Sequence, residues 1–150
     1  MKPIEQILVA TDFSPCAHAA ADLAARLAQQ VAATVHVMTM VDTSAAADAP
    51  GDAAYRRYHI DRLHGQSRER LQAFADEHFG PGAQVQIHVV DGGSDPNASR
   101  DIVRVAQELQ CGLIVLGTHG KTGIEHLVIG SVAEKVVRTS AIPVLTVRRA

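Results

Sequence analysis

Apolar residues along this chain of 150 residues switch repeatedly between a spacing of two and a spacing of about three and a half. Such switching is typical of strands that alternate with helices. The pattern predicts strands at residues 7–11, 34–41, 85–90, 113–116 and 143–147, and helices at about residues 15–31, 59–79, 101–109 and 131–138. The order βαβαβαβαβ implies an α/β fold with an open, mostly parallel sheet and right-handed crossovers.

Several element ends carry recognisable local signals. Ser14 is placed as the N-cap of the first helix, and Pro15 as its first helical residue. Residues 42–58 are weakly patterned, so we expect a surface loop there. No linker, repeat or low-complexity tract divides the chain, and we expect one domain over residues 1–150 with a variable loop at about 42–65.

The composition narrows the class of protein. Hydrophobic residues make up 47% of the chain but aromatic residues only 3%, as expected for a parallel sheet covered by helices. A net charge of -2 argues against a general nucleic-acid binder. Cys16 and Cys111 lack a CxxC companion, which favours a reducing compartment. We find neither a signal peptide nor an apolar run of ~18 residues, and we expect a cytoplasmic protein without membrane contact.

A candidate ligand site lies beyond the first and fourth strands, because ligands of open α/β sheets bind at the carboxyl ends of strands. Asp12 follows the first strand, and a loop with glycines at 117, 120 and 123 follows the fourth. Gly130 and Ser131 then open a helix, whose N–H groups and positive dipole end suit a phosphate. The spacing is neither that of a P-loop nor that of a GxGxxG fingerprint. The pattern indicates an anion or nucleotide site that is neither a P-loop nor a GxGxxG dinucleotide site.

Each of these residues also has an explanation without a ligand. Glycines after a buried strand often only make a tight turn, and Ser131 with Glu134 matches a capping box. Asp12 could be a turn carboxylate. Lys121 and His119 could be solvated side chains of an exposed loop. From the residues alone, both interpretations stay open.

The loop resembles the G-2x-G-9x-G-S/T signature of ATP-binding universal stress proteins, with Gly117, Gly120, Gly130 and Ser131 at the matching positions. The likeness extends over the whole chain except about residues 42–65, and it includes the segments ILVATDFSP, LIVLGTHGKTG, GSVAEKVVR and PVLTVRR. It implies a five-stranded parallel sheet in the order 3-2-1-4-5 with helices on both faces, Rossmann-like and similar to adenine nucleotide hydrolases.

The resemblance also implies a set of nucleotide contacts. Asp12 would hold the ribose hydroxyls, with Gly117 beside the same sugar, and adenine would lie near Val41. The remaining expected contacts, mostly with the phosphates, are Leu116, Gly120, Lys121, Gly130, Ser131 and the backbone N–H of Val132. The ligand would be ATP, ADP or AMP, and any Mg²⁺ would be held by the phosphates rather than by a protein cage.

Members of this family usually dimerise through the final strand, here residues 143–147. We therefore expect a nucleotide-dependent regulatory homodimer in the stress response. A slow ATPase or phosphotransferase and a nucleotide-free interaction module are the alternatives. Phosphoryl transfer needs a positioned metal and a group that orients the nucleophile, and no catalytic residue is evident in the loop.

Two further regions allow more than one interpretation. The segment 55–64 could cap the adenine pocket or form a surface loop, and the connection 91–97 is longer than the turn usual in the family. Eight histidines include no HExxH motif, and we expect no metal site. His36 and His88 lie on separate strands and could approach each other, but we interpret both as solvent-facing strand positions.

Overall fold

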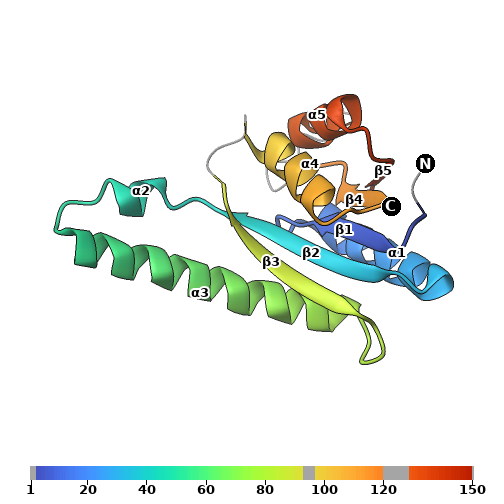
Figure 1. The fold of residues 1–150 in the computed structure, drawn as a ribbon, viewed down its shortest axis with the longest axis horizontal. Helices are drawn as coiled ribbons and strands as arrows, with labels where there is room; N and C mark the ends of the chain where they lie inside the picture. The colour runs from blue at the N-terminus through green and yellow to red at the C-terminus, as the bar shows by residue number, and fades with distance from the viewer. Residues whose placement is uncertain (1–2, 93–96, 120–128, 150) are drawn as a thin grey trace.

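The computed structural model describes residues 3–92, 97–119 and 129–149. Its centre is a five-stranded, all-parallel sheet in the order β3-β2-β1-β4-β5, which confirms the expected topology (Figure 1). The strands are β1 (Gln6–Ala10), β2 (Thr34–Val41), β3 (Val85–Asp91), β4 (Leu113–Gly117) and β5 (Val144–Val147). The strand order reverses between β1 and β4, and this is where the connections leave toward opposite sides of the sheet.

Helices cover both faces of the sheet. The helices of the described residues are α1 (Pro15–Val31), α2 (Ser44–Ala47), α3 (Ala53–His78), α4 (Ala98–Glu108) and α5 (Ser131–Thr139). Helices α1 and α3 pack on one face, and α4 and α5 pack on the other (Figure 1). The chain therefore forms a doubly wound α/β sandwich, as the alternating apolar pattern predicts.

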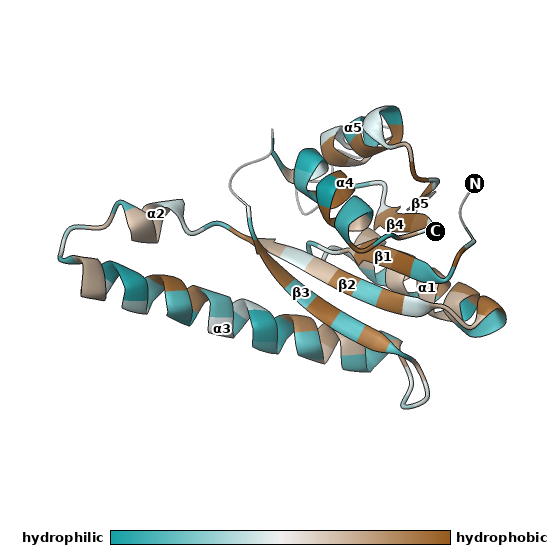
Figure 2. Ribbon diagram, viewed as in Figure 1, coloured by the Kyte–Doolittle hydropathy of each residue, from teal (hydrophilic) through white to brown (hydrophobic). Residues whose placement is uncertain are grey.

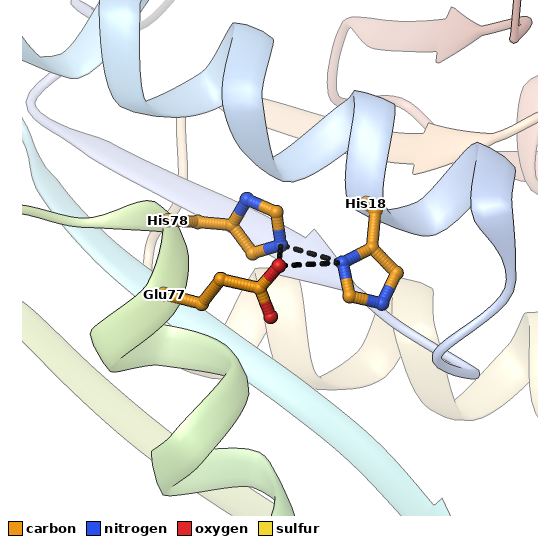
Figure 3. A group of neighbouring side chains, drawn as sticks. All are labelled: His18, Glu77 and His78. Carbon is orange, nitrogen blue, oxygen red and sulfur yellow. Dashed lines mark hydrogen bonds and ion pairs between the residues drawn. The ribbon is translucent and has the colours of Figure 1, made fainter.

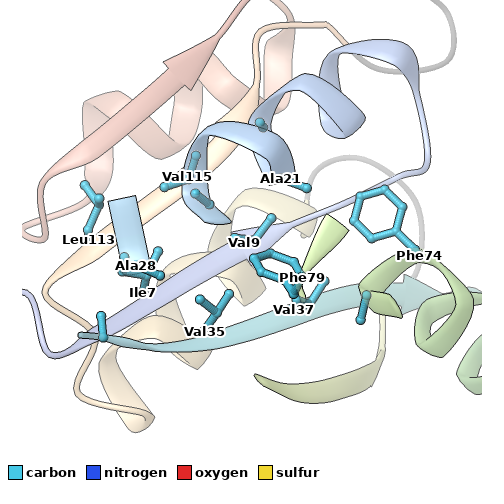
Figure 4. Close-up of a cluster of buried hydrophobic side chains, with 14 of the residues drawn as sticks. Ile7, Val9, Ala21, Ala28, Val35, Val37, Phe74, Phe79, Leu113 and Val115 are labelled. Carbon is cyan, nitrogen blue, oxygen red and sulfur yellow. The ribbon is translucent and has the colours of Figure 1, made fainter. Parts of the chain in front are cut away.

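Strand β1 illustrates how the sheet joins two cores. Ile7 and Val9 point to the α1/α3 face (Figure 4). Leu8 belongs to the core on the α4/α5 face, and all three residues are fully buried. Helix α1 approaches the sheet closely because its buried positions are all alanine: Ala17, Ala20, Ala21, Ala24 and Ala28. Small side chains at these positions explain how a core with so few aromatic residues packs densely.

The expected start of α1 is confirmed. Ser14 is the N-cap, its Oγ accepts a hydrogen bond from the Ala17 N–H at 3.3 Å, and Pro15 opens the helix. The same hydroxyl donates to the carbonyl oxygen of His119 at 3.2 Å. One serine thus stabilises the helix start and ties it to the chain segment after β4.

The prediction of a loop over residues 42–58 is wrong for much of that range. Helix α2 lies within it, and α3 begins at Ala53 rather than at residue 59. Asp52 is the N-cap of α3, and its carboxylate accepts a hydrogen bond from the Tyr55 N–H at 2.8 Å. The first half of α3 extends beyond the sheet and is largely hydrophilic (Figures 1 and 2). Apolar spacing could not reveal a helical segment that buries so little.

Helix α3 is 26 residues long, but its buried residues are only Leu71, Phe74 and Ala75. Among the residues described, no helix combines the length and the apolar character needed to cross a membrane.

Candidate functional site

A cleft of about 670 Å³ opens at the carboxyl ends of β1, β2 and β4. Its size lies within the range of ~300–1,000 Å³ usual for small-molecule sites. The structure brings together seven of the predicted contact residues along its walls: Asp12, Val41, Leu116, Gly117, Gly130, Ser131 and Val132. The other two, Gly120 and Lys121, lie outside the described residues. His119, the other candidate of this loop, also lines the cleft.

The turn after β1 forms one wall of the cleft. The Asp12 carboxylate accepts a hydrogen bond from the Ser14 N–H at 3.0 Å, and the Thr11 hydroxyl accepts one from the Phe13 N–H at 3.0 Å. Phe13 adopts a left-handed conformation with φ 62°, which is unusual for a residue with a bulky side chain. Asp12 therefore has the turn role that its sequence context allowed. A carboxylate has about four acceptor positions, so this role is compatible with a ribose contact as well.

Two glycines allow close approaches beside the cleft. A Cβ on Gly117 would lie 2.7 Å from the Cβ of Cys16 and 2.9 Å from the backbone nitrogen of Ala17. A Cβ on Gly130 would lie 3.0 Å from the carbonyl oxygen of Thr118, which accepts the Gly130 N–H. Close packing therefore explains why both positions are glycine in this fold. Each glycine also leaves its part of the cleft wall without a side chain.

Helix α5 begins at the opposite wall. Gly130 is its N-cap, and the Glu134 N–H makes a helical hydrogen bond to the Gly130 carbonyl at 2.9 Å. The interpretation of Ser131 and Glu134 as a capping box is therefore wrong, because Ser131 is already the first helical residue and Glu134 lies one position too far along. Backbone N–H groups of the first turn are directed out of a helix end, and here they lie at the cleft. With the dipole, this arrangement fits an anionic phosphate.

The structure adds lining residues that the sequence did not indicate. Phe13, Ser67 and Arg70 are among them. The Arg70 guanidinium carbon lies 4.0 Å from the centroid of the Phe13 ring, a cation–π contact that holds a positive charge at the cleft. Arg70 follows Phe13 by more than fifty residues, and no local motif connects the two. The segment 55–64, considered as a cap, is not among the lining residues of this cleft.

Asp42 lies at the end of β2, where the chain leaves the cleft. The hydroxyl of Ser44 donates to its carboxylate at 2.6 Å, and the Ser44 N–H donates at 2.9 Å. These hydrogen bonds, the hydroxyl first, lower the pKa of Asp42 below its ordinary value. The lining of the cleft therefore includes the acidic residues Asp12 and Asp42 and the basic residue Arg70.

The two strand histidines do approach each other, as their positions on separate strands allowed. His36 Nδ1 lies 3.0 Å from His88 Nε2, and His36 Nε2 lies 2.7 Å from Gln6 Oε1. His36 is only 4% exposed, so its interpretation as solvent-facing is wrong. Burial lowers the pKa of both histidines, with a further lowering of the His36 pKa by His88. Neither residue lines the cleft.

Comparison with protein-family profiles matches residues 3–148 to the Universal stress protein family. The chain belongs to that family. Among curated members, it is 29% identical over 145 residues to universal stress protein MJ0531 of Methanocaldococcus jannaschii, covering 97% of this chain and 82% of the relative. The solved structure of the universal stress protein MJ0577 of the same organism is 25% identical, with a TM-score of 0.81 over 98% of this chain and 97% of that one.

Two other universal stress proteins were solved with adenine nucleotides. One is in complex with cAMP, at 22% identity and a TM-score of 0.61 over 98% of both chains. The other, from Archaeoglobus fulgidus, is in complex with dAMP, at 21% identity and a TM-score of 0.55 over 98% of this chain and 99% of that one. At this identity, both likenesses show the shared fold.

Proposed function

We propose that this member of the family binds ATP, with ADP or AMP able to occupy the same site, and acts as a nucleotide-dependent regulatory homodimer in the stress response. The observation that carries the proposal is the cleft at the sheet's switch point, where Asp12 lies on one wall and the start of α5 on the other. Complexes of the same fold with cAMP and dAMP support an adenine nucleotide as the ligand class.

The cleft suggests how the ligand would lie. Asp12 would accept hydrogen bonds from the ribose hydroxyls, and Gly117 would leave room for the sugar. Val41 and the apolar side chains near it, among them Met40 and Ile102, would contact adenine. Gly130, Ser131 and the Val132 N–H would hold phosphate, joined by Gly120 and Lys121. Mg²⁺ that accompanies ATP would bind to the phosphates.

The dimer belongs to the proposal too. Strand β5 is the last strand on one side of the sheet, and each of its four residues is half-buried in the single chain. The outer side of such a strand has N–H and C=O groups available for another strand. We expect β5 of a second copy to pair there, and this strand begins 14 residues after Gly130 at the cleft.

Calorimetric titration of the nucleotide-stripped protein with ATP and Mg²⁺ tests the site. Wild-type protein should bind at micromolar strength or better, and Gly130→Val should weaken binding at least tenfold, because the new side chain meets Thr118 and intrudes on the phosphate position. Gly80→Val is the matched control, since a Cβ at Gly80 meets no atom within 4 Å. It should bind ATP like the wild type.

Absence of binding by the wild-type protein would overturn the proposal and favour a nucleotide-free interaction module. Sedimentation with and without ATP tests the regulatory part, and an equilibrium between monomer and dimer that ATP does not shift would contradict it. Multiple-turnover phosphate release that His119→Ala abolishes would instead identify an ATPase.

A further inference from the structure

A second polar cluster, whose residues do not line the cleft, lies where the first turn of α1 meets the last turn of α3 (Figure 3). It consists of His18 from α1 and of Glu77 and His78 from α3. His18 Nδ1 lies 2.7 Å from His78 Nε2, and Glu77 Oε1 lies 3.7 Å from His18 Nδ1 and 4.0 Å from His78 Nε2. Three potential metal-ligand atoms therefore converge on one point.

These distances fit a small divalent cation. Zinc binds His nitrogen at about 2.0–2.1 Å and carboxylate oxygen at similar lengths, so neighbouring ligands of a tetrahedral site lie about 3.3 Å apart. The three observed separations bracket that value. The two imidazoles would need to open by a few tenths of an ångström, and Glu77 would need to close by a similar amount. Glu77 is exposed and has the freedom to make this adjustment.

Asp22 fixes the orientation of one candidate ligand. His78 Nδ1 lies 2.7 Å from Asp22 Oδ1, and since a carboxylate only accepts, Nδ1 carries the proton. With the Nδ1 proton directed at Asp22, the tautomer of His78 that can bind a metal ion presents the lone pair of Nε2 to His18 and Glu77. A metal-binding histidine typically donates its other ring N–H to a carboxylate in this way.

The two imidazoles are also held by packing. The His78 side chain is 5% exposed and its ring lies 4.6 Å from the ring of Phe74, while the His18 ring lies 4.8 Å from that same phenyl ring. The open side of the cluster faces solvent, because the His18 side chain is 36% exposed and that of Glu77 62%. An ion could enter from this side and keep one water ligand.

We propose that His18, Glu77 and His78 form a binding site for a divalent transition-metal ion of the zinc type, with a fourth position open to water. Two imidazoles and one carboxylate are a ligand set that zinc accepts. The ion replaces the hydrogen bond between His18 Nδ1 and His78 Nε2, and the His18 ring proton moves through solvent from Nδ1 to Nε2, so that the neutral ring binds the ion through Nδ1. The bound ion links α1 to α3.

Zinc titration of the metal-stripped and nucleotide-free protein, with all 150 residues present, against a chromogenic chelator tests the proposal. We expect one Zn²⁺ per chain and at least a tenfold loss of affinity in His18→Gln and in Glu77→Gln. Asp22→Asn should lower affinity by roughly 10- to 100-fold without removing a ligand, because Asp22 only positions His78. Co²⁺ should give the visible absorption of a four-coordinate site in the wild type and lose it in His18→Gln.

The second histidine pair supplies a matched control. His36 and His88 are also in contact, but the other ring nitrogen of His36 meets the Gln6 amide instead of a carboxylate. His88→Gln should leave zinc affinity unchanged. The proposal is overturned if the wild type binds no zinc, or if folded His18→Gln binds it as tightly as the wild type. Equal losses in His18→Gln and His88→Gln would also overturn it, since they indicate nonspecific histidine binding. These measurements contain no nucleotide and are independent of the proposed ATP site.

Discussion

At the scale of single residues, the glycine at position 117 has two possible reasons, close packing against α1 and contact with the proposed ligand, and a substitution can distinguish them. Its missing Cβ leaves room for the backbone of Cys16 and Ala17, and backbone atoms cannot move aside as a flexible side chain can. We expect Gly117→Ala to lower the free energy of unfolding by about 1–3 kcal/mol, as overpacking usually does. Urea denaturation measures the change. Gly80→Ala, placed where the new methyl group has open space, should stay within about 0.5 kcal/mol of the wild type.

A Gly117→Ala protein as stable as the wild type would mean that α1 can move away from β4 at little cost. The structural need for glycine at position 117 would then disappear, and only the proposed ligand would account for it.

Sequence reasoning at this scale worked where a residue acts on its near neighbours. Ser14 and Pro15 mark the start of α1 because a cap and its helix are adjacent in the chain. Ser131 was ambiguous because one residue decides whether it is the cap or the first helical position, and only the backbone shows that Gly130 is the cap. Arg70 had no signal, since its contact with Phe13 is purely tertiary.

At the scale of elements, the strands were predictable and the start of α3 was not. Most residues of β1, β2 and β4 are buried on both faces of the sheet. Strands β1 and β4 are almost wholly apolar, and β2 is apolar except for two threonines and His36. The first half of α3 has no such face, and its clearest signal is Asp52, a cap that the apolar pattern cannot reveal. The apolar pattern of a sequence reveals elements that bury much surface, whereas a polar helix can be recognised only from its cap residue and from the helix propensity of its residues.

This gives Asp52 a measurable role. Asp52→Ala removes the acceptor for the Tyr55 N–H, and loss of an N-cap typically costs about 0.5–2 kcal/mol. The start of α3 extends beyond the sheet, so the loss should appear locally, as faster amide hydrogen exchange over about residues 53–60 with little change in global stability. Asp61→Ala, the same change inside the helix, should not accelerate that exchange. Uniform acceleration across the sheet would contradict a local role.

At the scale of the whole molecule, the position of the cleft was predictable because parallel strands bring their carboxyl ends to one edge. Asp12 and Gly130 are far apart in the chain, but each follows or precedes an element whose place in the sheet the strand order fixes. The cluster of His18 and His78 was not predictable in this way. It depends on how α1 and α3 cross, and no residue spacing in the sequence reveals the angle at which two helices cross.

The buried histidine pair predicts how global stability depends on pH. Folding lowers the pKa of His36, by burial and then by the proximity of His88, and it lowers the pKa of His88, by burial and then by Arg68, both from an ordinary value of 6.5. The unfolded chain therefore binds more protons than the folded one once the pH falls below about 6.5. The pair's contribution is fully present above that pH and is lost as the pH falls toward the folded pKa values.

Urea denaturation at pH 7.5 and at pH 5.5 should therefore show a lower free energy of unfolding at the acidic pH. His36→Gln removes one of the two groups whose pKa folding lowers, so the difference between the two pH values should become smaller. His59→Gln changes a histidine on the part of α3 that extends beyond the sheet, and it should keep the wild-type difference. If His36→Gln keeps the full difference, the acid sensitivity arises elsewhere, and the histidines of the α1–α3 cluster become the next variants to measure.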